Sequence, residues 1–202
     1  MLFRSAHLTS THTLLASTAA IMSCGAPQVP ERVQQVVDER RRATKRIEDL
    51  EAELAASVAD RLLSSAPRAA AVAGTEGEKA DVLVLHEHRT DDSANTLGFL
   101  SAITQAFANR VGEREKSGEK GLQFLLVLTS SPSAQTTASS TVVFVFGSDD
   151  KQVKQVGDEL RGKLNVKGGG KGTRWSGKFT GVWKDSREGT VVASVLESIK
   201  SS

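Results

Sequence analysis

The chain has 202 residues, of which 39% are hydrophobic and 25% are charged, and its formal net charge is +2. These values are ordinary for a soluble globular protein of one or two domains. The single cysteine, Cys24, excludes an internal disulfide framework, and no apolar run approaches the roughly 20 residues of a membrane-spanning helix. We therefore expect no membrane partner and a core built mainly from aliphatic side chains.

The N-terminal segment, residues 1–26, is rich in Ser, Thr and Ala, and the first 30 residues contain no acidic side chain. This composition is similar to that of a mitochondrial presequence, although Arg4 is its only arginine. A helix that belongs to a folded domain fits the segment equally well. We expect a cytoplasmic protein, with a mitochondrial location as the alternative, and a break at residues 25–30, which contain a glycine and two prolines.

Residues 27–66 predict one long charged helix. Residues 31–64 contain neither Gly nor Pro, and seven basic and eight acidic side chains accompany an apolar stripe along a helix of roughly 50 Å. We expect a coiled-coil-like arm that forms a homodimer or docks on a partner helix. A surface helix packed on its own domain is the alternative. The stripe consists of Val33, Val36, Ala43, Ile47, Leu50, Leu54 and Ser57, interrupted by Arg40 and Arg61.

After a linker at 67–79, residues 80–202 predict a small α/β (α+β) domain with a mixed sheet, because apolar runs alternate with amphipathic segments. The second and third strands most simply pair as an antiparallel hairpin, joined by a long loop at 130–140. A loop is also expected at 112–120. The predicted strands are 81–88, 122–128, 141–146 and 178–182, and the predicted helices are 95–111, 149–164 and 188–200.

The most informative segment, residues 167–179, combines five glycines, four cations and two aromatic residues. Glycine permits positive φ, and successive backbone amides in such a turn form a nest for phosphate oxygens. The cations would surround that nest, and Trp175 could stack on a base. A solvated connector between a helix and a strand is the structural alternative. The candidate nucleic-acid-binding residues are Lys167, Gly168, Gly169, Gly170, Lys171, Arg174, Trp175 and Lys178.

The local charge favours the phosphate-binding interpretation. Residues 161–187 contain eight Lys or Arg side chains and a single acid, Asp185, within a nearly neutral chain. Such a basic footprint indicates contact with a polyanion more than general solubility. The segment has neither the spacing of a Walker loop nor the strand-first context of a dinucleotide fingerprint.

No catalytic residue and no metal site are predicted. His86 and His88 lie on the same side of a predicted strand, but two ligands without a third nearby are a weak basis for a zinc site. A polar pair at the end of a strand is the simpler interpretation. Cys24 has no cationic neighbour in the sequence that would activate it as a nucleophile.

Three features occur together in this chain. They are the segment at 23–33 that leads into the long helix, the long charged helix itself, and the Gly-Gly-Gly-Lys-Gly-x-Arg-x-x-Gly-Lys segment at 168–178. This combination resembles the C-terminal region of AlaX-type alanyl-tRNA editing proteins, which is related to the C-terminal part of alanyl-tRNA synthetase. The α/β domain resembles the DHH-associated domain. The likeness covers residues from about 14 to 196 and implies that residues 1–26 are the remnant of an editing domain, unless they form a leader.

The resemblance implies a tRNA-binding module whose ligand is tRNA(Ala), without catalysis of its own. Editing domains of the family hydrolyse mischarged tRNA(Ala) with zinc held by His-x-x-x-His and Cys-x-x-x-His motifs, and neither motif occurs in this sequence. No cofactor is expected, and zinc would be expected only together with that editing domain. Two alternatives remain open: a helix-mediated interaction or dimerisation module, and a subunit or fragment of an aminoacyl-tRNA deacylase.

Overall fold

The computed structural model describes residues 2–65, 82–93, 95–117 and 121–200. It divides into two compact units, Met1–Glu51 and Ala52–Ser202. The predicted fold class is confirmed, because a long helix precedes a five-stranded mixed sheet with helices. The predicted linker at 67–79 lies outside the described residues. The second unit begins inside the long helix, whereas the sequence places the start of the α/β domain at residue 80.

The first unit contains helix α1 (Leu2–Ile21), the short turn η1 (Ala26–Gln28) and the first part of helix α2 (Val29–Ser64). The predicted break is present, and the side chain of Gln28 accepts a hydrogen bond from the Gly25 amide at 3.1 Å. Pro30 lies in the first turn of α2, where a missing N–H costs nothing. The predicted long helix is therefore confirmed.

The sheet of the second unit has the strand order β1-β2-β3-β5-β4. Strands β1 and β2 are parallel, and every other neighbouring pair is antiparallel, including the predicted β2–β3 hairpin. All eight residues of β2 are buried, as expected for a strand covered on both faces. The strands are β1 (Leu83–Thr90), β2 (Phe124–Ser131), β3 (Ser140–Gly147), β4 (Lys167–Lys171) and β5 (Arg174–Thr180).

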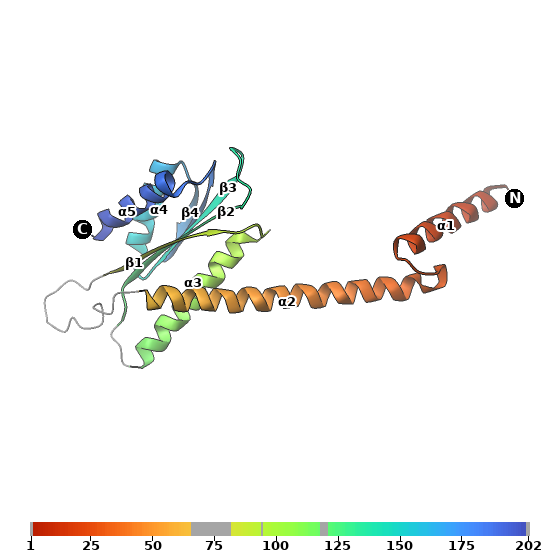
Figure 1. The fold of residues 1–202 in the computed structure, drawn as a ribbon, viewed down its shortest axis with the longest axis horizontal. Coiled ribbons are helices and arrows are strands. Elements are labelled where there is room, and N and C mark those ends of the chain that lie inside the picture. The colour runs from red at the N-terminus through yellow and green to blue at the C-terminus, as the bar shows by residue number, and fades with distance from the viewer. Residues whose placement is uncertain (1, 66–81, 94, 118–120, 201–202) are drawn as a thin grey trace. The chain divides into compact units, whose positions relative to one another are not determined.

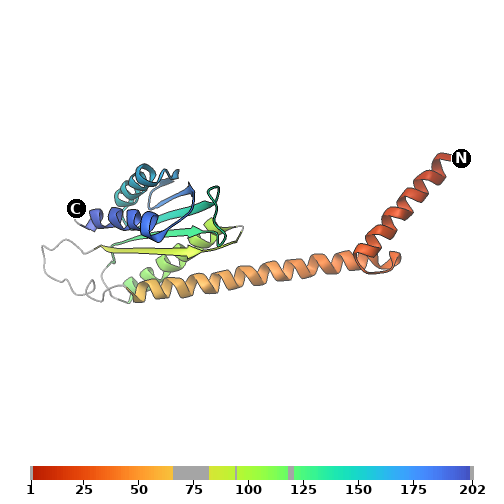
Figure 2. The same ribbon diagram turned by 45° about the horizontal axis from the view of Figure 1, so that its top comes forward.

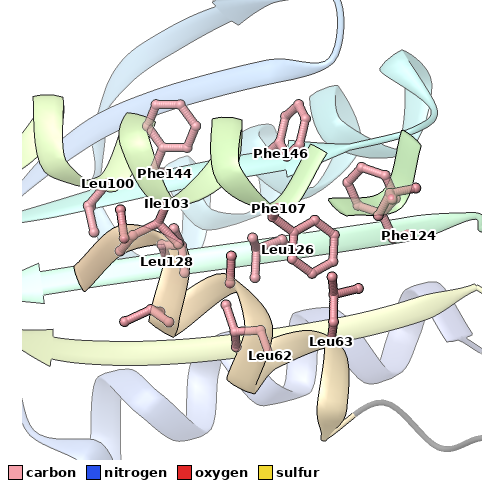
Figure 3. Close-up of a cluster of buried hydrophobic side chains, with 14 of the residues drawn as sticks. Leu62, Leu63, Leu100, Ile103, Phe107, Phe124, Leu126, Leu128, Phe144 and Phe146 are labelled. Carbon is pink, nitrogen blue, oxygen red and sulfur yellow. The ribbon is translucent and has the colours of Figure 1, made fainter. Parts of the chain in front are cut away.

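Helices cover the two faces of this sheet. Helix α3 (Thr96–Lys116) and the last turns of α2 pack on one face, and α4 (Asp150–Leu164) and α5 (Thr190–Lys200) pack on the other (Figures 1 and 2). Figure 3 shows the first core, where Leu62 and Leu63 of α2 lie beside Phe107 of α3 and the strand side chains beneath them. The second core contains Val127, Val145 and Trp175 of the sheet.

Polar caps place the ends of two helices close to their predicted positions. The Asn95 side chain accepts a hydrogen bond from the Gly98 amide at 3.2 Å, and the Asp149 carboxylate accepts one from the Lys151 amide at 2.8 Å. Helix α3 continues to Lys116, so the first part of the loop predicted at 112–120 is helical. Helix α5 begins at Thr190 after a π-helical turn, η3 (Asp185–Gly189), rather than at residue 188.

The glycine-rich segment differs most from its prediction. It forms strand β4, which pairs with β5 through a two-residue turn, Gly172-Thr173, whereas the sequence predicts a loop followed by a strand at 178–182. Gly172 has a φ of 62°, a conformation that glycine adopts without a steric penalty. The hairpin forms because β5 pairs with β3 along its length and offers β4 a second edge.

Candidate nucleic-acid interface

The four predicted cations of the glycine-rich segment lie on one face of the β4–β5 hairpin. Lys167 is paired with Lys178, and Lys171 is paired with Arg174. Because alternate residues of a strand share a face, the two cationic pairs point the same way and lie roughly 13 Å apart along the strands. Gly169, paired with Ser176, lies between them. We call this surface the cationic face.

The cationic face belongs to the side of the sheet that carries α3. The guanidinium of Arg174 lies 5.6 Å from the ring centroid of Phe146, and Ser176 is paired with Phe144; both rings belong to the core beneath α3. Helix α3 therefore borders this surface, and α4 and α5 lie behind the sheet.

Charge on the cationic face is not neutralised by the protein. All four cations are exposed, and none forms an ion pair with a described acidic residue. Like charges directly opposite one another across two strands destabilise the pairing. By contrast, the nearby Lys163 and Arg161 pair with Glu159 and Asp158. A bound polyanion would remove the repulsion across the hairpin.

Protection of a sheet edge explains only part of this charge. Strand β4 is an edge strand, and lysines on edge strands discourage pairing with other chains. Arg174 and Lys178, however, lie on β5, which has β3 and β4 on its two sides. Their positive charges therefore need another explanation.

The three consecutive glycines of β4 have different local surroundings. A Cβ atom at Gly168 would lie 2.2 Å from the Ser176 carbonyl oxygen, and one at Gly170 would lie 2.2 Å from the Arg174 carbonyl oxygen. Backbone packing therefore requires glycine at both positions. A Cβ atom at Gly169 would meet nothing within 4 Å, so packing does not require glycine there.

Two details of the predicted site are wrong. Gly168, Gly169 and Gly170 lie in a paired strand, and the positive φ of this segment falls on Gly172, so these glycines form no anion-binding nest. Phosphate binding would depend instead on the side-chain cations. Trp175 is only 3% exposed and packs over Gly157 of α4, so its indole offers no surface on which a base could stack.

A pocket of about 480 Å³ opens between the start of α3 and the hairpin. Arg174 is one of its lining residues, and its Nη2 donates a hydrogen bond to Oε1 of Gln105 at 3.1 Å. This contact ties the hairpin to α3 and orients the guanidinium. The lining consists of Asn95, Leu97, Gly98, Ser101, Phe144, Gly169, Gly170, Lys171, Arg174, Trp175 and Ser176.

His86 and His88 form a polar pair, but both lie inside β1, which continues to Thr90, rather than at the end of a strand as predicted. His86 Nε2 and His88 Nδ1 lie 3.2 and 2.9 Å from the Thr129 hydroxyl, and the His88 ring stacks on Trp183 with centroids 4.5 Å apart. Burial lowers the pKa of His86 to about 4, and neighbouring His88 acts in the same direction. Burial also lowers the pKa of His88, against the raising effect of Asp185 and Glu87. A hydroxyl between two neutral rings can donate to one and accept from the other.

Other classes of site find no support in the parts of the chain that the structure describes. No cluster of three or more His, Cys, Asp or Glu side chains suitable for a metal ion occurs there. Among the same residues, none of the helices combines the length and hydropathy needed to cross a bilayer.

Two comparisons of the sequence with known proteins identify no relative. No protein-family model matches the sequence, and a search of the curated proteins finds no match. The resemblance to alanyl-tRNA editing proteins therefore stays a prediction that depends on the residues quoted above.

The residues of α3 beside the hairpin are absent from the predicted site. Leu97, Gly98 and Ser101 belong to an ordinary amphipathic helix, and no local signal connects them with the glycine-rich segment. A signal for the burial of Trp175 is present, because Trp175, Gly177 and Phe179 alternate with polar residues along β5. This period of two predicts a strand with its aromatic side chains on one face.

Proposed function

We propose that this protein is an RNA-binding module, with tRNA as its ligand, and that RNA contacts it through the cationic face of the β4–β5 hairpin. The observation that carries the proposal is the pair of like-charged cross-strand contacts, Lys167 with Lys178 and Lys171 with Arg174, which no described acid neutralises. Phosphate oxygens are the ligands that arginine and lysine side chains bind most readily. The choice of tRNA(Ala) among polyanions depends on the resemblance to editing proteins.

The binding mode differs from the one that the glycine-rich sequence suggests. Side-chain cations, rather than backbone amides, would hold the phosphates, so binding releases counterions and weakens steeply with salt. Four phosphate contacts correspond to a slope of about −3 in a plot of log K against log salt concentration. Catalysis forms no part of the proposal.

The test measures binding of tRNA(Ala) and of an unrelated tRNA to the full chain across a salt series. Arg174→Ala and Lys178→Ala should each weaken binding about fivefold and reduce the salt slope by about one. The matched control is Lys154→Ala, which removes an exposed cation from α4 on the other face of the sheet. It should leave affinity nearly unchanged.

Equal losses in all three variants would contradict the assignment of the cationic face, because general charge would then explain the binding. An absence of binding at low salt would refute RNA binding altogether. A higher affinity for tRNA(Ala) than for the unrelated tRNA would extend the proposal to selectivity.

A second candidate function is association through α2. Several apolar side chains of this helix have exposed fractions between 38% and 57%, and an apolar stripe of this kind needs a surface to pack against. Such a stripe is typical of a helix that pairs with another helix. The exposed residues up to Leu50 are Val33, Val36, Val37, Ile47 and Leu50.

A further inference from the structure

The pocket between α3 and the hairpin has apolar side chains in its lining. The ring of Phe144 is only 6% exposed, and Leu97 of the first turn of α3 is 41% exposed. Ser101 is also a lining residue. The volume of about 480 Å³ falls within the range of pockets that hold small organic groups. A phosphate alone would leave this apolar surface in contact with water.

Two cations are also part of the lining of the pocket. Lys171 and Arg174 both line it, and Arg174 is oriented by Gln105 and by the ring of Phe146. Apolar side chains and positive charge therefore occur together in the lining of one open pocket. A nucleotide combines the same two properties. Its base is flat and weakly polar and suits the apolar lining, and its phosphate is negatively charged and suits the cations.

Gly169 is an open position beside this pocket. It lines the pocket, and a Cβ atom there would meet nothing within 4 Å, so local backbone packing would accept a side chain. Its neighbours Gly168 and Gly170 are required by contact with β5, but Gly169 is not. Glycine allows a ligand to approach the strand closely. This explains the glycine at position 169, which backbone packing does not require.

We propose that this pocket receives the base and ribose of an unpaired nucleotide whose phosphates contact Lys171 and Arg174. The inference rests on the proposed RNA binding and makes it more specific: the preferred ligand is a single-stranded end or loop rather than a continuous duplex. A base within a duplex is stacked between its neighbours and cannot enter a cavity, whereas bases of loops and ends can leave the stack.

The test compares three RNA probes in binding to the full chain: a blunt duplex, the same duplex with a short 3′ overhang, and that overhang with abasic sites that retain the phosphates. The overhang should increase affinity about tenfold, and the abasic overhang should lose most of this gain, because one bound base contributes a factor of this order. Gly169→Leu should abolish the gain by filling the pocket.

Gly162→Leu is the matched control, because Gly162 is exposed on α4 and a Cβ atom there also meets nothing within 4 Å. Thermal unfolding verifies that both variants fold. Equal affinity for the blunt duplex and the two overhangs, with weakening of all three by Arg174→Ala, would overturn the pocket inference and leave RNA binding intact. Absence of binding to every probe would overturn both.

Discussion

His86 is the side chain whose surroundings most change its chemistry. Its imidazole is half-buried beside His88 and accepts or donates a hydrogen bond at the Thr129 hydroxyl, and its pKa is lowered to about 4 from an ordinary 6.5. The folded protein therefore holds a neutral ring that the unfolded chain would protonate below pH 6.5. Between these two values the unfolded state binds more protons than the folded state.

We expect stability to fall as the pH is lowered from about 6.5 toward about 4, with the contribution of His86 fully present above pH 6.5. A pKa shift of this size corresponds to about 3 kcal/mol. Urea unfolding at a series of pH values measures it. His86→Gln should flatten the dependence, because the amide can bond Thr129 but does not titrate.

His12→Gln is the control, because His12 is exposed on α1. Its pH dependence should match that of the unaltered protein. An unchanged slope in His86→Gln would show that other titrating groups, such as the carboxylates, produce the acid sensitivity.

The last turns of α2 are the element whose role depends most on packing. Ala59 is completely buried, Leu62 and Leu63 are each 4% exposed, and these side chains share a core with Phe107 of α3 (Figure 3). Arg61 in the same turns forms an ion pair with Glu87 of β1. This part of the helix is therefore a layer of the α/β unit, and its polar residue contacts the sheet.

Leu62→Ala should lower the free energy of unfolding by about 3 kcal/mol, the usual loss for a buried leucine that leaves a cavity. Leu50→Ala, on the same helix but 45% exposed, should cost less than about 1 kcal/mol. Chemical denaturation of both variants provides the comparison. Similar losses in the two would contradict the inclusion of the helix end in the core.

The β4–β5 hairpin shows how an element can combine opposite requirements. Gly168 and Gly170 allow the backbones of the two strands to approach closely, although glycine weakens a strand through its conformational entropy. The two like-charged pairs weaken the hairpin further. Such a local conflict is expected at functional sites, where binding outweighs stability.

At the scale of the whole molecule, the exposed stripe of α2 predicts self-association. If α2 pairs between chains, sedimentation equilibrium should show a mass that rises with protein concentration. Ile47→Asp should shift the protein toward the monomer, because a buried charge at a helix pair is costly. Leu14→Asp on α1, where the leucine is 65% exposed, is the matched control and should have no effect.

A monomer at every concentration would exclude the homodimer and leave a partner helix as the remaining use of the stripe. The RNA-binding proposal does not depend on the oligomeric state. Variants of the cationic face should therefore leave the mass unchanged, and this separates the two candidate functions experimentally.

The elements that the sequence predicts well are those with strong local signals. The apolar run at 122–128 and the pattern at 141–146 identify β2 and β3, and Asn95 and Asp149 mark the starts of α3 and α4. In these cases the periodicity or the cap acts over a few residues, so no distant contact is needed to recognise the element.

The glycine-rich segment could not be assigned in this way. Three successive glycines have a low intrinsic preference for a strand, and only pairing with β5, itself paired with β3, holds them extended. The position of Trp175 follows from the same pairing, which turns its indole toward α4. Leu97 and Gly169 meet at one pocket although they are far apart in the chain.

The amino-acid sequence by itself determined the long helix, the order of most elements and the basic footprint near the C-terminus, because these depend on composition and on contacts within one or two turns. Tertiary structure decided that the glycines form a strand, that four cations share one face, and that α3 closes a pocket beside them. Strand pairing is a long-range interaction, and it alone sets which side chains face the solvent together.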